Sequence, residues 1–285
     1  MKKIKIGILG VGYVGLACLE SFSKSFEVIT YDKDTSKSTE VSLENLIEKA
    51  NIFFICLPTP MNLDGSCNSD LINDALSAIN LFEDKVCVIK STVPPGTTTI
   101  FQKKYKNIKI FYNPEFLTEA NFIEDFNNQK QIIVGSSNND GFHLIETIYK
   151  KSLPQAKIIN CSYEESEIVK YFINTFLAMK VSFSNEFYTL CKKLEVDYDN
   201  IKQIVALDSR VGFSHLSVPG PDGKKGFGGS CFPKDINAII NVFNVYKLNP
   251  LILTSVWQRN ILLDRQERDW EKLKGRAVIS DEKKI

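Results

Sequence analysis

Gly10-Val11-Gly12-Tyr13-Val14-Gly15 follows a short apolar run, residues 4–9, and opens a segment with a helical pattern. The first glycine of such a motif permits a tight turn, the second lets a pyrophosphate approach the backbone, and the third lets helix and strand pack closely. The free N–H groups at the start of the helix favour an anion. These six residues are therefore predicted to form a dinucleotide-binding turn.

Asp32 ends the second apolar run, twenty residues after Gly12. A carboxylate at this position accepts hydrogen bonds from the ribose hydroxyls of NAD and repels the extra phosphate of NADP. NAD is therefore the predicted cofactor. The alternative reading of Asp32 is a turn residue at the end of a strand.

Apolar, β-rich runs alternate with helical patterns through the first half of the chain. The runs are residues 4–9, 26–31, 52–57, 86–90, 108–112, 131–134 and 158–161. Such alternation predicts an α/β fold in which a doubly wound parallel sheet carries helices on both faces. We assign residues 1–161 to this Rossmann-like NAD-binding domain.

From Ser162 the pattern becomes helical, and Ser162 with Glu165 has the spacing of a capping box. No proline or glycine interrupts the helical pattern before about Leu194. Further helices are expected at 198–207, 233–246 and 251–268, with a loop rich in glycine and proline at 218–229. The sequence predicts a mostly α-helical second domain, residues 162–270, and a short charged tail, residues 271–285.

The charge balance, the apolar runs and the cysteine spacing exclude several kinds of binding partner. Lysine plus arginine (35) nearly equals aspartate plus glutamate (34), which argues against a nucleic-acid-binding surface. The apolar runs are far shorter than the roughly 20 residues of a membrane span, and the seven cysteines form no CxxC pair. We expect a cytoplasmic protein with no leader, no membrane segment and no metal site.

The stretch Gly226-Phe227-Gly228-Gly229-Ser230-Cys231-Phe232-Pro233-Lys234-Asp235 carries the strongest chemical signal. Its glycines allow close backbone approach, and Pro233 suits the first turn of a helix. Cys231 would then precede a helix amino terminus with Lys234 nearby, and both influences favour a nucleophilic thiolate. The alternative is a buried cysteine beside a helix cap.

Several motifs, in order along nearly the whole chain, resemble those of the UDP-glucose 6-dehydrogenase group of the UDP-glucose/GDP-mannose dehydrogenase family. The matching stretches are 10–15, Ile55-Cys56-Leu57-Pro58-Thr59-Pro60, Lys90-Ser91-Thr92-Val93-Pro94-Pro95-Gly96-Thr97, Asn113-Pro114-Glu115-Phe116-Leu117, 170–174, Asp208-Ser209-Arg210-Val211-Gly212 and 226–235. The resemblance implies oxidation of the C6 alcohol of UDP-glucose to the carboxylate of UDP-glucuronate by two NAD⁺, through a thiohemiacetal and a thioester on Cys231.

The resemblance also implies roles for other side chains. Lys170 and Asn174 would stabilise the oxyanion, and their spacing of four puts a cation and an amide donor on one helix face. Asp235 would transfer protons through water, Glu115 would be the base for thioester hydrolysis, and Thr92 would hold a water nearby. Each residue also has an alternative without a catalytic role. Lys170 could be a solvated charge on a helix, and Asn174 a surface amide. Asp235 could be an acid at the start of a helix, Glu115 an acid at the end of a strand, and Thr92 a turn residue.

Further contacts follow from the same resemblance. Thr59, Thr92 and Lys234 would contact NAD together with the glycine turn and Asp32. Substrate contacts would come from Phe116, Leu117, Glu119, Lys170, Asn174, Arg210, Phe227 and Gly228, although core packing is an equally common role for the aromatic residues. Arg210 would reach the substrate of a neighbouring subunit, which together with the long helix predicts a homodimer.

The chain departs from the family pattern in two places. It is shorter between Asp32 and Ile52, and it stops about ten residues after Gly275, where family members continue into a domain that grips UDP. Lys224 and Lys225 lie in a loop that either contacts the diphosphate or forms a solvated turn. Open alternatives are therefore a non-catalytic NAD-binding subunit, a dehydrogenase for UDP-N-acetylmannosamine or GDP-mannose, and a one-step hydroxyacid dehydrogenase, which has no use for Cys231.

Overall fold

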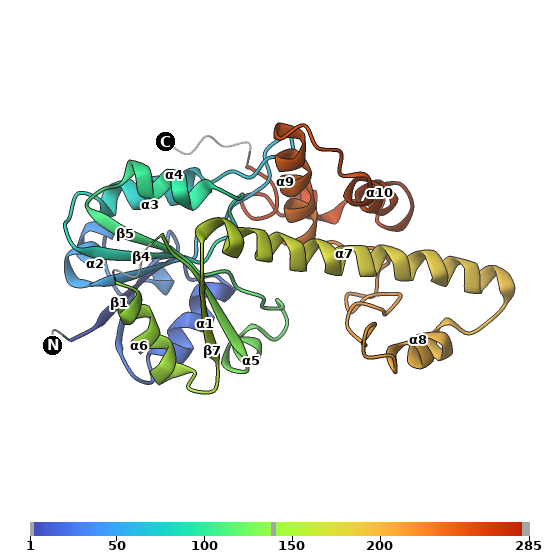
Figure 1. Ribbon diagram of the computed structural model, residues 1–285, viewed down its shortest axis with the longest axis horizontal. Helices are drawn as coiled ribbons and strands as arrows, with labels where there is room; N and C mark the ends of the chain where they lie inside the picture. The colour runs from blue at the N-terminus through green and yellow to red at the C-terminus, as the bar shows by residue number, and fades with distance from the viewer. Residues whose placement is uncertain (1–2, 138–140, 281–285) are drawn as a thin grey trace. The chain divides into compact units, whose positions relative to one another are not determined.

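The computed structural model describes residues 3–137 and 141–280, which belong to two compact units (Figure 1). The first unit comprises Met1–Thr59 and Ser69–Lys170, and the second comprises Pro60–Asn68 and Tyr171–Ile285. Among the described residues, no helix combines the length and apolar character needed to cross a bilayer.

The first unit is built on a seven-stranded sheet in the order β2-β1-β3-β4-β5-β6-β7. Its strands are β1 (Lys5–Leu9), β2 (Glu27–Tyr31), β3 (Ile52–Ile55), β4 (Lys85–Ile89), β5 (Ile108–Tyr112), β6 (Gln131–Gly135) and β7 (Lys157–Cys161). Each of the seven predicted runs forms a strand, and the predicted α/β class is confirmed.

Helices cover both faces of this sheet, as predicted. One face packs against α2 (Leu43–Lys49), α3 (Asp70–Ile79) and α4 (Thr97–Lys104), and the other packs against α1 (Tyr13–Phe22), α5 (Phe122–Asn127) and α6 (Phe142–Ser152). A 3₁₀ turn, η1 (Thr35–Lys37), follows β2. Neighbouring strand residues serve opposite faces: Phe53 packs with the first set of helices and Phe54 with the second.

The sheet is parallel, as predicted, except where β5 joins β6. β6 and β7 pair in parallel with each other, but β6 joins β5 antiparallel, through the single pair Tyr112 and Gly135. An apolar run predicts a buried strand without giving its direction, so the sequence pattern carries no sign of this reversal.

The second unit is helical. The 32-residue helix α7 (Tyr163–Leu194) begins in the first unit, and its residues from Tyr171 onward belong to the second. The predicted capping box is present, because Ser162 Oγ accepts from the Glu165 N–H and the Glu165 carboxylate accepts from the Ser162 N–H. The other helices are α8 (Tyr198–Ala206), α9 (Phe232–Val245) and α10 (Leu251–Arg259).

The helix expected over residues 251–268 ends early. After α10 the chain makes one π turn, η2 (Asn260–Asp264), and leaves the helix at Arg265, whose N–H donates to the Asn260 carbonyl at 2.7 Å. From this turn the side chains of Asn260 and Arg265 bond to the backbone of Phe227 and Lys225.

The chain around residue 270, where the helical domain was expected to end, packs into the second unit. A 3₁₀ turn, η3 (Asp269–Lys272), buries Trp270 against Trp257, with ring centroids 5.4 Å apart. Further on, the Ala277 carbonyl accepts a hydrogen bond from the Met61 N–H at 2.9 Å. The segment therefore contributes to the core and to the backbone pairing of this unit.

A buried carboxylate ties the start of α7 to α4. Glu167 is fully buried and accepts hydrogen bonds from the Gly96 N–H at 2.6 Å and from the Thr98 N–H and hydroxyl at 2.8 and 2.6 Å. These groups lie at the amino end of α4, where a carboxylate also interacts favourably with the helix dipole. Burial raises the pKa of Glu167 to about 7, although these hydrogen bonds lower it.

We expect Glu167 to make stability pH-dependent. Because its pKa is higher in the folded state than the ordinary 4.5, the folded chain holds a proton that the unfolded chain releases between these values. The free energy of unfolding should therefore fall by about 3 kcal/mol as pH rises from about 4.5 to 7. The free energy of unfolding, measured with urea at each pH, should depend less steeply on pH in Glu167→Gln than in the wild type. Glu83→Gln, at an exposed position in the loop before β4, should keep the wild-type slope, and equal slopes for all three proteins would contradict this assignment.

Candidate active site

The glycine turn lies where the strand order of the first unit switches. β1 lies between β2 and β3, and in open α/β sheets ligands bind outside the carboxyl ends of strands at such a point. Gly10 has φ +85°, and a Cβ there would lie 2.7 Å from the Cys56 carbonyl oxygen. A Cβ on Gly15 would lie 1.9 Å from the Gly10 carbonyl oxygen. Both positions therefore require glycine for packing within the protein.

Gly12 differs from the other two glycines of the turn. A Cβ built there meets nothing within 4 Å, and Gly12 caps α1 without any side-chain hydrogen bond to the helix end. Backbone N–H groups at a helix amino terminus form an anion site. The open space at Gly12 therefore fits the pyrophosphate of a dinucleotide.

Asp32 is held against this turn. Its Oδ2 accepts from the Val11 N–H at 2.6 Å and its Oδ1 from the Asp34 N–H at 2.9 Å. Each carboxylate oxygen can accept more than one hydrogen bond, so both can still serve ribose hydroxyls. Thr59 and Thr92, two more of the predicted cofactor contacts, are buried in the segments that follow β3 and β4, the strands that come after β1 in the sheet order.

Glu115 and Lys170 form a buried ion pair in the first unit. The Lys170 ammonium, on a side chain only 3% exposed, lies 3.0 Å from Glu115 Oε1 and also donates to the Glu115 carbonyl. Burial raises the pKa of Glu115, but the Lys170 charge and the Leu117 N–H lower it more, so that its pKa lies below the ordinary value. Glu115 is therefore ionised at neutral pH, as a base must be.

The residues after Glu115 have varied surroundings. The Lys170 ammonium lies 5.2 Å from the centre of the Phe116 ring, a cation–π distance. Leu117 is half-buried and packs against the core of the first unit, and Glu119 is exposed. Their predicted substrate contacts stay predictions.

Cys231 is the N-cap residue of α9 in the second unit, and Pro233 follows within the first turn, as expected. Its sulfur is half-buried and lies 3.9 Å from the Ser230 hydroxyl. Helix α9 is 14 residues long. The dipole at the amino end of a helix is one of the influences by which proteins activate a cysteine, so this position suits a nucleophile.

Three polar side chains form a chain beside Cys231. Asp235, 1% exposed, bonds the Lys234 ammonium through one oxygen at 2.5 Å and the Asn174 amide through the other at 2.6 Å. Burial lowers the pKa of Lys234, but the charges of Asp235, Cys231 and Cys67 outweigh burial and raise its pKa above the ordinary value. Lys234 therefore stays a cation close to the sulfur of Cys231.

Cys67 is a neighbour that sequence reasoning missed. It lies in Pro60–Asn68, a segment distant in sequence that belongs to the second unit and packs with α9 residues. No motif spacing relates position 67 to position 231, so only the fold reveals that both cysteines act on Lys234.

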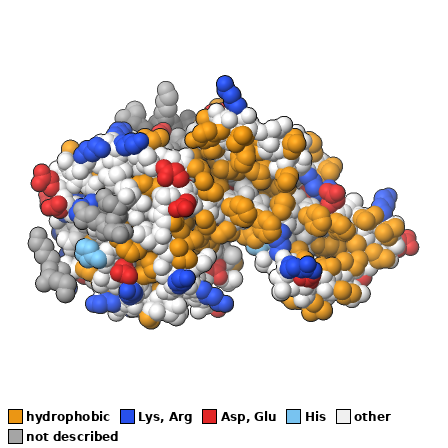
Figure 2. All heavy atoms as spheres, in the orientation of Figure 1, with side chains coloured by type: hydrophobic (Ala, Val, Ile, Leu, Met, Phe, Trp, Pro, Cys, Tyr) orange, Lys and Arg blue, Asp and Glu red, His pale blue; other side chains and the backbone are white. Residues whose placement is uncertain are grey.

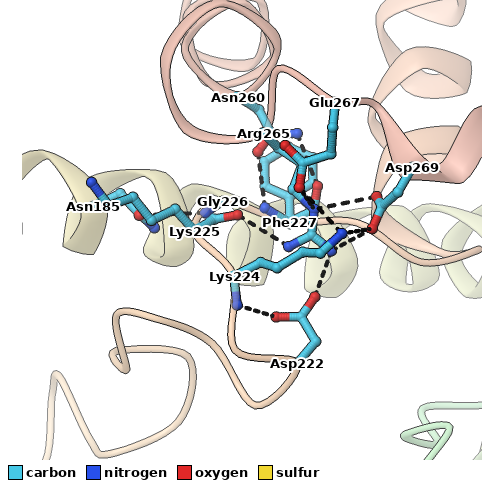
Figure 3. A network of polar contacts seen from close by, with 10 residues as sticks. All are labelled: Asn185, Asp222, Lys224, Lys225, Gly226, Phe227, Asn260, Arg265, Glu267 and Asp269. Atoms are coloured by element: carbon cyan, nitrogen blue, oxygen red, sulfur yellow. Dashed lines mark hydrogen bonds and ion pairs between the residues drawn. The ribbon is translucent and has the colours of Figure 1, made fainter.

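Side chains of the loop before Cys231 pair with residues outside the predicted site (Figure 3). Lys224 pairs with Asp269 at 3.1 Å and with Glu267 at 3.3 Å, and Lys225 lies over the Tyr188 ring. Phe227 is buried in a hydrophobic cluster of the second unit. Lys224 therefore belongs to an ion-pair network. The sequence had suggested either a diphosphate contact or a solvated turn for this lysine, and neither includes these ion pairs.

Arg210 lies on an exposed turn after α8. Its side chain is 87% exposed and pairs with Asp208 at 2.6 Å. Its predicted role toward a neighbouring subunit stays a prediction.

The predicted site residues fall into two groups, one in each unit. The first unit holds the glycine turn, Asp32, Thr59, Thr92 and the Glu115–Lys170 pair, and the second holds Cys231 with Asn174, Lys234 and Asp235. Lys170 and Asn174 lie one turn apart on α7. The described residues contain no group of three His, Cys, Asp or Glu side chains placed to hold a metal ion.

Comparison with known proteins gives family matches for both parts of the chain. Residues 38–153 match the NAD binding domain of the UDP-glucose/GDP-mannose dehydrogenase family, and residues 164–261 match its central domain. The chain is 37% identical to UDP-glucose 6-dehydrogenase of Rickettsia typhi over 81% of its length, and 30% identical to UDP-glucose 6-dehydrogenase TuaD of Bacillus subtilis over 96%. It spans 54% of the former protein, about half, and 68% of the latter.

Among solved structures, the chain is similar to a UDP-glucose dehydrogenase from Pyrobaculum islandicum. The TM-score is 0.81 at 29% identity, over 90% of this chain and 68% of that one. The matched domains, the glycine turn and the cysteine motif at the start of α9 lead to one conclusion: the chain belongs to the UDP-glucose/GDP-mannose dehydrogenase family.

Proposed function

We propose that this chain oxidises the C6 alcohol of UDP-glucose to a carboxylate, with Cys231 as covalent nucleophile and NAD⁺ as oxidant. The observation that carries the proposal is Cys231 at the amino end of α9, beside the Lys234–Asp235–Asn174 chain. UDP-glucose is the substrate for which relatives such as the Rickettsia typhi enzyme are named, and this chain spans about half of that enzyme. UDP-N-acetylmannosamine and GDP-mannose are the alternative substrates.

The cofactor site fits NAD, with the pyrophosphate at Gly12 and the ribose at Asp32. NAD⁺ bound there supplies the hydride acceptor for both oxidations. The Cys231 thiolate adds to the C6 aldehyde, forming a C–S bond and an oxyanion. After the second oxidation water attacks the thioester, the C–S bond breaks, and the thiolate is restored.

The chain's polar side chains have distinct tasks in these steps. The Lys170 ammonium and the free N–H of the Asn174 amide stabilise the oxyanion. Glu115, ionised through its pairing with Lys170, accepts the proton of the attacking water, which Thr92 helps to hold. Asp235 exchanges protons with the sulfur side of the reaction through water.

We also propose a homodimer formed through the second unit. Exposed hydrophobic side chains gather over the surface of α7 in Figure 2. They recur at helical spacing along one face: Phe172, Phe176, Phe183, Phe187, Leu190 and Leu194. Apolar patches of this extent on a protein surface mark interaction sites. Sedimentation equilibrium tests the proposal, and a monomer at micromolar concentration would contradict it.

The stoichiometry of the reaction tests the proposed function. Purified protein is incubated with NAD⁺ and UDP-glucose, UDP-N-acetylmannosamine or GDP-mannose, and NADH formed per sugar consumed is counted. Two equivalents with UDP-glucose are expected. NAD binding without NADH formation would support a non-catalytic subunit, and one equivalent with a released carbonyl product would support a one-step dehydrogenase.

A further inference from the structure

The segment that leads to Cys231 is held by side chains rather than by backbone pairing. The Asn260 amide makes two hydrogen bonds with Phe227, accepting from its N–H and donating to its carbonyl, both at 2.9 Å. Arg265 donates to the Lys225 carbonyl at 3.1 Å, and Asn185 accepts from the Gly226 N–H at 3.3 Å. Three consecutive residues thus have their backbone bound by side chains from α7 and from the η2 turn.

Arg265 is the charged centre of this network (Figure 3). Its side chain is 2% exposed, and its guanidinium bonds both Asp222 and Asp269. Burial lowers the pKa of Arg265, but these two carboxylates raise it above the ordinary value, so the cation persists. A guanidinium has several donors in a fixed plane, so Arg265 fixes Asp222, Lys225 and Asp269 in one arrangement.

Two glycines of the cysteine motif make room for this network. Gly226 has φ +63°, and a Cβ there would lie 2.4 Å from Asn260 Oδ1. A Cβ on Gly228 would lie 2.5 Å from Arg265 Nη2. By contrast, a Cβ on Gly229 meets nothing within 4 Å. The first two glycines are therefore required by Asn260 and Arg265, and the open side belongs to Gly229, two residues before Cys231.

The η2 turn explains how both side chains reach the segment. Its closing hydrogen bond runs from the Arg265 N–H to the Asn260 carbonyl, five residues earlier. Such π turns inside helices are rare and are frequent at functional sites. The irregular turn therefore presents Asn260 and Arg265 together to residues 225–228.

We propose that Asn260 and Arg265 are positioning residues for Cys231, an inference that rests on the proposed function of that cysteine. By fixing residues 225–228, they set the path of Gly229 and Ser230 and hold the sulfur at the amino end of α9, close to Lys234. Loss of either contact frees the segment, moves the sulfur away from the helix end, and raises the pH at which the thiol ionises.

The test measures the reactivity of the thiol itself. The rate of iodoacetamide alkylation at Cys231 is followed by peptide mass spectrometry between pH 6 and 10, for the wild type, Arg265→Met and Asn260→Ser. Buried Cys191, which belongs to the same unit as Asn260 and Arg265, serves as an internal reporter of unfolding. We expect both variants to shift the alkylation midpoint upward by at least about half a pH unit while Cys191 stays unreactive, and kcat to fall about tenfold or more with KM for NAD⁺ unchanged.

Arg259→Met is the matched control. Arg259 is a partly buried arginine on the preceding turn that pairs with Glu186 and Asp264. This variant should keep the wild-type midpoint. If Arg265→Met does not fold, Arg265→Lys keeps the charge without the planar donors and should show the same upward shift.

A lower melting temperature with an unchanged alkylation profile in the Arg265 and Asn260 variants would overturn the proposal, because it would reduce the network to a purely structural one. The alkylation profile does not depend on turnover. A wild type that forms no NADH with any nucleotide sugar would therefore refute the proposed function, while the thiol measurement still decides the role of Asn260 and Arg265.

Discussion

Cys231→Ser is expected to lower kcat for NADH formation from UDP-glucose by about 10³-fold or more. A serine hydroxyl at the amino end of α9 is not ionised at neutral pH. The helix dipole and the charge of Lys234 both favour the thiolate of a cysteine at the same position. Without the covalent step the aldehyde is not trapped, so the second oxidation fails. Steady-state assays of NADH formation measure the loss.

Cys67→Ser is the matched control, because Cys67 also lies close enough to act on Lys234 but is not part of the cysteine motif. It should retain turnover within a few-fold of the wild type. NAD binding and the melting temperature should be unchanged in Cys231→Ser. A Cys231→Ser protein that still forms two NADH per sugar at a comparable rate would refute the nucleophile.

Gly15→Ala is expected to destabilise the first unit by at least about 3 kcal/mol, and so to lower its melting temperature by about 6–12 °C. The new methyl group would lie 1.9 Å from the Gly10 carbonyl oxygen, a backbone atom that cannot move without displacing β1 from α1. Calorimetry measures the change, and an unchanged melting temperature would contradict the close approach of helix and turn.

Gly12→Ala separates binding from folding at the same turn. Gly12 has φ −76°, which alanine adopts readily, and its Cβ direction is open. Stability should change by less than about 1 kcal/mol. NAD⁺ affinity should fall about tenfold or more, because the methyl group occupies the space assigned to the pyrophosphate. Titration calorimetry would contradict the assignment if Gly12→Ala bound NAD⁺ as tightly as the wild type.

Local patterns predicted the first unit well, because its signals are carried by neighbouring residues. The run at residues 4–9, the glycine turn and Asp32 lie within one strand–helix–strand repeat, and each has the structural context it was assigned. The direction of β6 was not predictable, since an apolar run is the same when read from either end. Its pairing is fixed by contacts between segments distant in sequence.

In the candidate site, contacts between residues close in sequence were predictable, and contacts between distant residues were not. Cys231, Lys234 and Asp235 are close in sequence, and their association on the first turn of α9 follows from helix geometry. The bonds of Lys170 to Glu115 and of Asn174 to Asp235 join residues more than 50 positions apart. Asn260 and Arg265 were missed because nothing around them in the sequence resembles a site, and their role depends on a π turn that no periodicity predicts.

If the sugar becomes covalently bound to Cys231 during the reaction, the bound species can be trapped by slowing its hydrolysis. Glu115→Gln, which removes the proposed base for hydrolysis, is mixed with UDP-glucose and NAD⁺ and analysed by intact-protein and peptide mass spectrometry. We expect a nucleotide-sugar acyl adduct on Cys231 that hydroxylamine releases, and none in the double variant with Cys231→Ser. Complete two-step turnover by the wild type with no adduct on Cys231 in the Glu115→Gln protein, or with the adduct on another residue, would contradict this expectation.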